Sequence, residues 1–292
     1  MQLLDGKTLS ATLKAELKQK TNAIREKGGK IPHLAAVLVG NDPASEAYVR
    51  SKVRSCAEVG FESTLIRHET DVTETELLQT IHDLNTNPEI DGFIVQLPLP
   101  KHINEEKVML AIDFRKDVDG FHPVNFGRMA QGMTAYLPAT PFGIVQMLER
   151  YGVATSGKHC VVVGRSNIVG TPISILMSRK GRDCTVTLTH SRTADLRAEC
   201  LRADIIVAAI GIPNFITADM VKQDAVVVDV GINRIEDATA KNGSRLVGDV
   251  DFENVAEKCS FITPVPGGVG LMTVVALLQN TLMAANKEIY SN

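Results

Sequence analysis

A tyrosine and a lysine four residues apart, Tyr48 and Lys52, lie in the segment YVRSK. On a helix this spacing places both side chains on one face, beside an apolar stripe formed by Val49, Val53 and Cys56. A lysine held against apolar surface loses the solvation of its charged form, so its pKa falls toward values that suit proton transfer. A Tyr/Lys pair is also typical of an ordinary solvated helix edge, and the sequence leaves both interpretations open.

Gln96 ends an apolar run in the segment GFIVQLPLP. We expect a buried strand over 92–97 to deliver this side chain to the carboxyl end of a sheet, where α/β folds place ligand sites. Pro98 and Pro100 are expected to end the strand in extended form. Because an unpaired buried amide costs ~1–3 kcal/mol, Gln96 needs a partner, which is either a reacting group or nearby backbone.

Two acids flank a turn in the segment KDVDGF. A carboxylate on such a loop can accept two N–H donors from a heterocycle. The alternative is an Asx turn before Gly120, which would occupy one of Asp117 and Asp119 and leave the other free.

The segment VVVGRSNIVGTP predicts a strand, a turn that contains Gly164, and a helix. Backbone N–H groups and the helix N-terminus then converge on an anion, and in a doubly wound sheet a dinucleotide pyrophosphate sits at this place. Gly164 and Gly170 bracket five residues, so the spacing is not G-x-G-x-x-G, and a purely structural turn is the alternative.

The end of the following strand indicates the type of dinucleotide. It reads His190-Ser191-Arg192, and no acid occurs before Asp195 to meet a ribose 2′-hydroxyl in the manner of NAD-binding folds. Ser191 and Arg192, together with Arg165 of the first turn, suit a 2′-phosphate, because guanidinium pairs bidentately with phosphate. We therefore expect NADP rather than NAD. Solvated surface charges are the alternative for both arginines.

A glycine-rich loop, TPVPGGVG, precedes the last expected helix. Three glycines within four residues allow the backbone to approach a ligand closely. The loop can also serve as a crossing between domains, and the two roles are compatible.

Strands and helices alternate along the chain, which favours α/β layers with a mostly parallel sheet. The stretch 116–141, with its glycines and prolines, predicts loops and short turns leading to a domain boundary. An apolar stripe over 271–285 predicts a helix that returns to the first domain. The expected strands are 34–39, 63–66, 92–97, 159–163, 185–189, 205–210, 225–230 and 261–262.

The composition is that of a globular protein of two domains. The 292 residues are about double a typical domain, and 31 basic against 34 acidic residues argue against nucleic-acid binding. Five cysteines without C-x-x-C and seven histidines without H-x-x-x-H predict neither disulfides nor a metal site. Without a secretory signal or an apolar run of ~18 residues, we expect a cytoplasmic protein with no membrane partner.

Six segments in this order resemble the bifunctional methylenetetrahydrofolate dehydrogenase/methenyltetrahydrofolate cyclohydrolase family in its compact bacterial form. They are YVRSK, GFIVQLPLP, KDVDGF, GRSNIVGTP, VVDVGIN with VGDV, and TPVPGGVG, and they span essentially the whole chain. The resemblance implies an α/β catalytic domain that binds folate, formed by 1–140 and 268–292, with the last helix returning to it. It also implies a Rossmann-type parallel-sheet domain for NADP at 141–267, and a homodimer.

The resemblance also implies roles for single residues. Lys52 corresponds to the family's catalytic lysine, Tyr48 to its stacking and positioning partner, Gln96 to the residue that tunes the lysine, and Asp119 to the carboxylate that holds the pterin. The implied substrate-binding residues are Tyr48, Lys52, Val95, Gln96, Leu97, Asp119, Pro266, Gly267 and Gly268. The implied cofactor-binding residues are Gly164, Arg165, Ser166, Ser191 and Ile232, the last near the nicotinamide.

Two positions depart from the family pattern. Leu271 stands where the family usually has proline, and the lost φ restraint could loosen the loop, although a helix can begin without proline. Ala139 stands where the family usually has cysteine, which argues against a catalytic thiol.

The expected reactions belong to one-carbon metabolism: NADP-dependent oxidation of 5,10-methylenetetrahydrofolate to the methenyl form, then hydrolysis to 10-formyltetrahydrofolate. A competing interpretation is another two-domain NADP dehydrogenase, such as one resembling shikimate dehydrogenase, which would not account for YVRSK, QLPLP and DVDG together. A non-catalytic protein that senses a dinucleotide or acts as a scaffold would keep the turn at Gly164 without needing Lys52.

Overall fold

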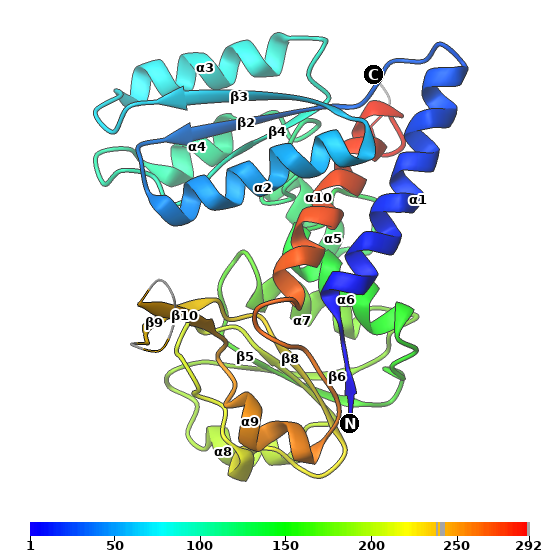
Figure 1. Cartoon of the computed structure of the whole chain (residues 1–292), viewed down its shortest axis with the longest axis vertical. Coiled ribbons are helices and arrows are strands. Elements are labelled where there is room, and N and C mark those ends of the chain that lie inside the picture. Colours follow the sequence, from blue (N-terminus) through cyan, green and yellow to red (C-terminus); the bar gives the residue numbers. More distant parts are fainter. Residues whose placement is uncertain (238, 240–242, 291–292) are drawn as a thin grey trace. The chain divides into compact units, whose positions relative to one another are not determined.

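The computed structural model describes residues 1–237, 239 and 243–290, and the chain divides into two compact units. Unit 1 comprises residues 1–10 and 140–273, and unit 2 comprises residues 11–139 and 274–292. Each unit has its own parallel β-sheet with helices packed on it (Figure 1). This confirms the predicted two-domain α/β fold.

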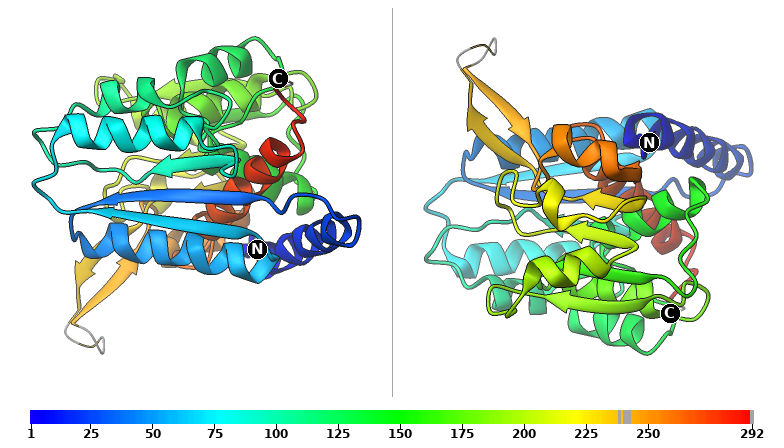
Figure 2. Two further views of the ribbon diagram at one scale, coloured as in Figure 1. Left: turned by 90° about the horizontal axis from the view of Figure 1, so that it is seen from above. Right: turned by 90° about the horizontal axis from the view of Figure 1, so that it is seen from below.

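Unit 2 is built on a three-stranded parallel sheet whose central strand is β2 (His33–Val39), flanked by β3 (Glu62–His68) and β4 (Gly92–Val95). Six of the seven residues of β2 are buried, because helices cover both faces of the sheet. Figure 2 shows α2 (Pro43–Val59) on one side and α3 (Glu74–Thr86) and α4 (Glu105–Ala111) on the other.

Local sequence fixes both ends of α2, the helix that carries the segment YVRSK. Asp42 caps its start, since the carboxylate accepts the N–H of Ser45 at 2.7 Å, and Pro43 occupies the first turn. The helix ends at Gly60, which adopts φ +81° as helix-terminating glycines do. These ends fix which residues of the segment face the sheet.

Six strands form the parallel sheet of unit 1: β1 (Gln2–Leu3), β5 (His159–Val163), β6 (Thr185–Thr189), β7 (Ile205–Ala208), β8 (Ala225–Asp229) and β11 (Cys259–Ile262). Their order is β1-β11-β8-β7-β5-β6. The chain passes from β5 outward to β6, and then from β7 outward to β8 on the other side. The sheet is therefore doubly wound about β5 and β7, where folds of this kind bind ligands.

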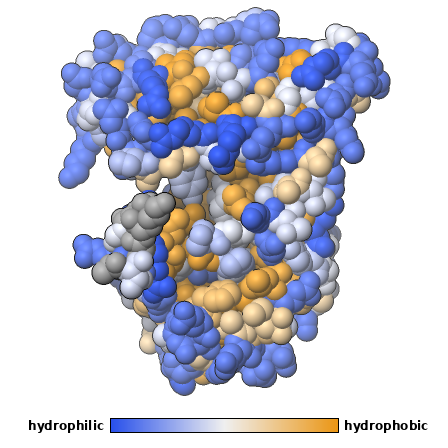
Figure 3. All heavy atoms as spheres, in the orientation of Figure 1, coloured by the Kyte–Doolittle hydropathy of each residue, from blue (hydrophilic) through white to orange (hydrophobic). Residues whose placement is uncertain are grey.

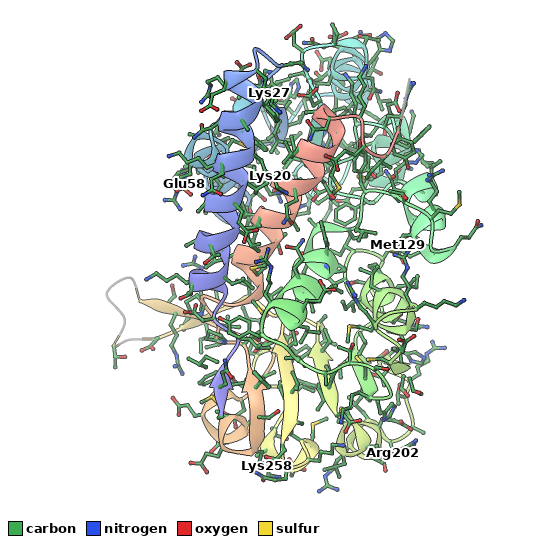
Figure 4. All side chains as sticks on the ribbon, turned by 90° about the vertical axis from the view of Figure 1, so that its right-hand side faces the viewer. Lys20, Lys27, Glu58, Met129, Arg202 and Lys258 are labelled. Atoms are coloured by element: carbon green, nitrogen blue, oxygen red, sulfur yellow. The ribbon has the colours of Figure 1, made fainter. Side chains whose placement is uncertain are left out.

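Smaller elements complete unit 1. In Figure 4, Arg202 and Lys258, which lie shortly before β7 and β11, mark the amino end of the sheet, opposite to the residues discussed below. The elements are α7 (Gly170–Ser178), α8 (Leu196–Arg202), α9 (Phe252–Val255), the antiparallel strands β9 (Asn233–Glu236) and β10 (Ser244–Val247), and the 3-10 turns Ala218–Met220 and Ala256–Lys258.

The division between the units falls within three helices, α1 (Gly6–Glu26), α6 (Ala139–Arg150) and α10 (Val269–Ala285). It differs from the predicted boundaries for residues 1–10 and 268–273, which both cluster with unit 1. Residues 1–10 cluster with unit 1 because β1 pairs in parallel with β11, Leu3 opposite Ile262. A two-residue strand gives no periodic signal, so the sequence could not indicate this pairing.

The stretch 116–141 is more regular than predicted. It contains α5 (Pro123–Ala130), which begins with His122 as its cap and Pro123 in the first turn. The His122 ring nitrogen Nδ1 accepts the N–H of Val124 at 3.1 Å. Histidine is not among the usual capping residues, which is why the helix start was missed. The strand expected over 92–97 ends at Val95, and the Leu97–Pro98 peptide that follows is cis.

All five cysteines are buried free thiols. Burial raises the pKa of each of them, so they behave as small apolar side chains. Within the described residues, no helix combines the length and hydropathy that crossing a bilayer requires. Figure 3 shows mainly hydrophilic residues on the face that it presents, with apolar patches among them.

Candidate active site

Lys52 lies on the buried face of α2, with only 6 % of its surface exposed. Its Nζ donates to Gln96 Oε1 at 3.2 Å. Gln96 follows β4 directly, and its backbone N–H donates to Val37 O at 2.9 Å, which extends the sheet by one hydrogen bond. Its side-chain Nε2 donates to Leu97 O at 2.7 Å. Both polar atoms of the Gln96 side chain therefore have partners: backbone binds the amide nitrogen, and the amide oxygen accepts from the lysine.

The electrostatics of Lys52 depend on burial and on Asp119. Burial lowers the pKa of Lys52 below its ordinary value, and the negative charge of Asp119 raises it part of the way back. The same two effects act on Asp119 with opposite signs: burial raises the pKa of its carboxyl and the charge of Lys52 lowers it. A lysine in this setting has a neutral amine accessible nearer to physiological pH, and it can accept and return a proton.

Tyr48 lies one helical turn before Lys52 and is half-buried. Burial raises the pKa of its phenol, so the hydroxyl stays protonated and can donate a hydrogen bond. Val95 is buried and Leu97 is half-buried, on either side of Gln96 along the chain. The structure thus rejects the solvated helix edge as an account of Lys52.

The two acids of KDVDGF have different surroundings. Asp117 is buried and accepts the backbone N–H groups of Phe121 at 3.3 Å and of His122 at 2.8 Å. It thus shapes the turn, in which Gly120 adopts φ +75°. Asp119 is the carboxylate that interacts with Lys52. The turn-forming interpretation therefore applies to the first acid, and the functional one remains for the second.

In unit 1, the turn after β5 has the close backbone packing that a phosphate-binding loop requires. Gly164 has φ +109°, and a Cβ on it would overlap Ala209 O. A Cβ on Gly170 would overlap Gly164 O. Ser166 Oγ accepts the N–H groups of Val169 at 3.2 Å and Gly170 at 3.3 Å, so its own hydroxyl hydrogen is left to donate to an anion.

The other predicted cofactor residues lie at the same carboxyl edge of this sheet. Val163 pairs with Thr189, so the turn after β5 and the residues Ser191 and Arg192 after β6 are neighbours. Ser191, Arg192 and Arg165 are exposed. Ile232 follows β8 and is 45 % exposed. Cationic, hydroxyl and apolar groups along one edge fit the phosphates, ribose and ring of a dinucleotide.

Two buried acids of unit 1, Asp229 and Asp249, were not predicted from the sequence to have a role of their own. Asp229 ends β8, and its carboxylate accepts the N–H groups of Gly231 at 3.0 Å, Asp249 at 2.9 Å and Val250 at 3.0 Å. It thereby ties the loop after β8, which carries Ile232, to the segment 247–250.

Asp249 makes the reciprocal connection. Its carboxylate accepts the N–H groups of Ile210 at 2.7 Å and Gly211 at 2.9 Å, in the loop after β7, and the Asn233 amide at 2.9 Å. A Cβ on Gly231 would overlap Asp249 Oδ1. The available signal was the pairing of acid and glycine in VVDVGIN and VGDV, which the sequence analysis used only for the resemblance.

The loop after β11 contains Pro266, Gly267 and Gly268, and it belongs to unit 1. Gly267 has φ +106°, and the Val265–Pro266 peptide is cis. Leu271 lies in the first turn of α10, and its N–H donates to Gly268 O at 3.3 Å. The helix therefore begins without the family's usual proline, as expected.

Two family models match the chain. Residues 4–119 match the catalytic domain of tetrahydrofolate dehydrogenase/cyclohydrolase, and residues 138–289 match the NAD(P)-binding domain of the same enzymes. The chain belongs to the tetrahydrofolate dehydrogenase/cyclohydrolase family. This confirms the predicted family and enzyme class, and it excludes both competing interpretations of the function.

Individual members of the tetrahydrofolate dehydrogenase/cyclohydrolase family resemble the chain along its whole length. The bifunctional protein FolD of Porphyromonas gingivalis is 60 % identical over 286 residues, which are 97 % of each chain. The crystal structure of the Campylobacter jejuni FolD enzyme is 44 % identical, covers 99 % of each chain and superposes with a TM-score of 0.93.

A third relative concerns the cofactor. The methylenetetrahydrofolate dehydrogenase-cyclohydrolase of Trypanosoma brucei is 34 % identical over 98 % of each chain, with a TM-score of 0.93, and its structure contains NADP and an inhibitor. Together with the matched NAD(P)-binding domain, it agrees with the cofactor predicted for this family member.

Proposed function

We propose that this enzyme oxidises 5,10-methylenetetrahydrofolate to 5,10-methenyltetrahydrofolate with NADP⁺ and hydrolyses the product to 10-formyltetrahydrofolate. The observation that carries the proposal is the buried Lys52, whose Nζ lies 3.2 Å from Gln96 Oε1 and whose pKa responds to Asp119. Membership of the family supports the same pair of reactions.

Lys52 is the group that moves protons in the hydrolysis. The methenyl carbon is electrophilic, and the neutral amine accepts a proton from the water molecule that adds to it. The resulting ammonium then donates this proton to N5 of the folate as the bond between that nitrogen and the one-carbon unit breaks. Loss of the second water proton gives the formyl group. Burial favours this role because it lowers the pKa of Lys52.

Gln96 and Asp119 adjust the lysine and hold the substrate. The Gln96 amide oxygen stabilises the ammonium form of Lys52, which offsets part of the cost of burying the charge. The carboxylate of Asp119 accepts N–H donors from the pterin ring. Tyr48, with its protonated phenol on the same helix face, stacks on the substrate and positions it. The further folate contacts that we propose are Val95, Leu97, Pro266, Gly267 and Gly268.

The residues at the carboxyl edge of the sheet in unit 1 bind the cofactor. When bound, NADP⁺ accepts the hydride from the one-carbon bridge. Gly164, Arg165 and Ser166 bind its phosphates, Ser191 and Arg192 favour a 2′-phosphate, and Ile232 contacts the nicotinamide end. On this proposal, unit 1 is the cofactor domain, which contains the predicted segment 141–267, and unit 2 is the folate domain.

A homodimer is the proposed assembly, and the support for it is the resemblance to the family. Sedimentation equilibrium tests it directly. We expect a mass of twice 31.6 kDa at micromolar concentration. A mass of 31.6 kDa over the whole concentration range would contradict the proposal.

The replacement Lys52→Met tests the proposed chemistry. We expect it to abolish hydrolysis of the methenyl substrate and to leave NADP-dependent oxidation of the methylene substrate measurable, because hydride transfer needs no proton from Lys52. The first activity is measured by loss of methenyl absorbance and the second by its appearance with NADPH. Arg54→Met, an exposed cation half a turn later on α2, is the matched control and should retain both activities. Unchanged hydrolysis in Lys52→Met would refute the role of the lysine.

A further inference from the structure

Tyr290, near the C-terminal end of the chain, is seated among aromatic and cationic side chains of unit 2. Its ring packs edge-on against Phe114, with centroids 5.0 Å apart, and against Tyr136, with centroids 5.6 Å apart. The Arg128 guanidinium lies 5.2 Å above the ring centre. The Tyr290 hydroxyl donates to Asn125 Oδ1 at 2.5 Å. These contacts fix both the ring and its polar tip.

Asn125, on α5, is fully buried and connects Tyr290 to the turn of KDVDGF. Its Nδ2 donates to Asp117 Oδ2 and to Phe114 O, both at 2.9 Å. With both amide hydrogens bound to acceptors, Oδ1 must find a donor, and the hydroxyl of Tyr290 supplies it. Tyr290 therefore holds the Asn125 amide in the orientation that presents N–H to Asp117.

Asp117, which accepts from the Asn125 amide, also fixes the backbone of the turn. It accepts the N–H groups of Phe121 and His122, two and three residues after Asp119. The N–H of Ala139 donates to Asp119 O at 3.2 Å. These hydrogen bonds thus fix the backbone on the C-terminal side of Asp119.

Asn280, on α10, holds the other side of the same turn. Its Nδ2 donates to Val118 O at 2.8 Å and to Leu137 O at 2.9 Å. Gly120 packs so closely on Leu137 that a Cβ on it would lie 2.5 Å from the carbonyl carbon. The turn is therefore fixed by residues of α5, which follows it closely, and by residues of α10 and the C-terminal segment, which lie far from it along the chain.

We propose that Tyr290 is a positioning residue for substrate binding: through Asn125 and Asp117 it holds the turn in the geometry in which Asp119 binds the pterin. The inference rests on the proposed role of Asp119. A carboxylate that accepts two N–H donors from a planar ring must be fixed in both position and orientation. Small displacements of its backbone therefore weaken the two hydrogen bonds to the ring. Tyr290 touches neither substrate nor cofactor in this role.

The replacement Tyr290→Phe tests the proposal because it removes only the hydroxyl and keeps the ring. We expect the KM for the folate substrate to rise about fivefold in both activities, the effect of one lost hydrogen bond, which is roughly 1 kcal/mol. The kcat of the oxidation, which needs no proton from Lys52, and the KM for NADP⁺ should stay unchanged. A loss of folded protein would lower kcat and leave KM unchanged, so the split separates positioning from stability.

Glu288→Gln serves as the matched control, since Glu288 is exposed in the same C-terminal segment. It should leave the folate KM unchanged. A second variant, Tyr290→Leu, also removes the ring contacts, and it should raise the folate KM further than Tyr290→Phe does. An unchanged folate KM in both Tyr290 variants would overturn the inference.

A double-mutant cycle with Asp119→Asn separates this inference from the proposed function. If Tyr290 acts through Asp119, Tyr290→Phe should change the folate KM by less than twofold in the Asp119→Asn background. A further fivefold rise there would show independent action and overturn the inference alone. An Asp119→Asn enzyme with unchanged folate KM would instead refute the role of Asp119 itself.

Discussion

Buried carboxylates shape two regions of the molecule: the turn that carries Asp119 in unit 2, and the loops after β8 and β10 that Asp229 joins in unit 1. The hydrogen-bond partners of the two carboxylates differ in kind. Asp117 accepts two backbone N–H groups and one side-chain amide, and that amide depends on Tyr290 in turn. Asp229 accepts three backbone N–H groups, two of them from the segment 247–250.

This difference determines how each loop tolerates change. The orientation of a side-chain partner such as Asn125 depends on its own partner, Tyr290, so a distant residue can affect the turn in unit 2. Backbone partners cannot rotate, and the carboxylates in unit 1 approach the chain so closely that Gly231 and Gly248 have no room for a Cβ. The turn in unit 2 therefore responds to substitutions in the C-terminal segment. The loops joined by Asp229 in unit 1 have little room for any substitution.

The largest expected effect is that of Gly248→Ala. A Cβ at this position would overlap the Asp229 carboxylate, which cannot move without breaking its hydrogen bonds. We expect a loss of about 3 kcal/mol of stability and weaker NADPH binding, measured by circular dichroism melting and by calorimetry.

Gly127→Ala is the matched control for this replacement. Gly127 lies within α5, a Cβ there would meet nothing within 4 Å, and alanine is favoured over glycine in a helix by up to ~1 kcal/mol. It should keep or raise the melting temperature. Equal melting temperatures for the two variants would contradict the close packing described at Gly248.

The next largest effect is expected for Asp229→Asn. Whichever side-chain oxygen becomes NH₂, at least one backbone N–H then faces another donor, at a cost of roughly 2 kcal/mol. Asp117→Asn should cost only about half as much. With the new NH₂ in the place of Oδ1, only the long contact with Phe121, at 3.3 Å, is lost, and the remaining oxygen still accepts from His122 and Asn125. Urea unfolding of both variants measures the difference, and the reverse order of stabilities would refute the comparison.

A further expected effect concerns pH. Burial raises the pKa of Asp117 to about 7, although hydrogen bonds from His122 and Asn125 oppose this rise. Between about pH 4 and pH 7 the folded chain therefore binds a proton at Asp117 that the unfolded chain does not bind. The stability contributed by this proton is full at the acid end of the window and is lost as the pH rises through 7.

Asp117→Asn should remove a slope of about 1 kcal/mol per pH unit between pH 5 and pH 7. Tyrosine fluorescence during urea unfolding measures it, since the chain has no tryptophan and three of its four tyrosines, Tyr48, Tyr136 and Tyr290, lie in unit 2. Asp71→Asn, at an exposed position of unit 2, is the control and should leave the slope in place. The same slope in Asp117→Asn as in the unmodified enzyme would show that Asp117 does not titrate in this window.

Much of the fold could be predicted because its signals are local. The strands β2, β5 and β8 are each recognisable as a short continuous apolar run, and Asp42-Pro43 and Gly60 mark both ends of α2. The missed elements lack such signals: β1 has two residues, and α5 begins with an unusual cap, His122. The β9–β10 pair depends on cross-strand contacts that no single segment displays.

The candidate site divides in the same way. Spacing alone placed Tyr48 and Lys52 on one helix face, and residue type alone suggested that one of two aspartates would be consumed by its turn. Which aspartate remained was decided by the fold, because Asp117 accepts hydrogen bonds from Phe121, His122 and Asn125. The charge of Asp119 instead interacts with that of Lys52.

The sequence by itself determined the alternation of elements, the caps of α2, the glycine turn after β5 and the residue types that suit a dinucleotide. These follow from backbone preferences and from periodicity over a few residues, so neighbours along the chain suffice to reveal them. Tertiary structure alone decided that Lys52 is buried and donates to Gln96. It also decided the hydrogen bond from the Asp249 N–H to Asp229 and the one from the Tyr290 hydroxyl to Asn125. Burial and hydrogen-bond partners come from residues up to 165 positions away, and only folding brings those residues together.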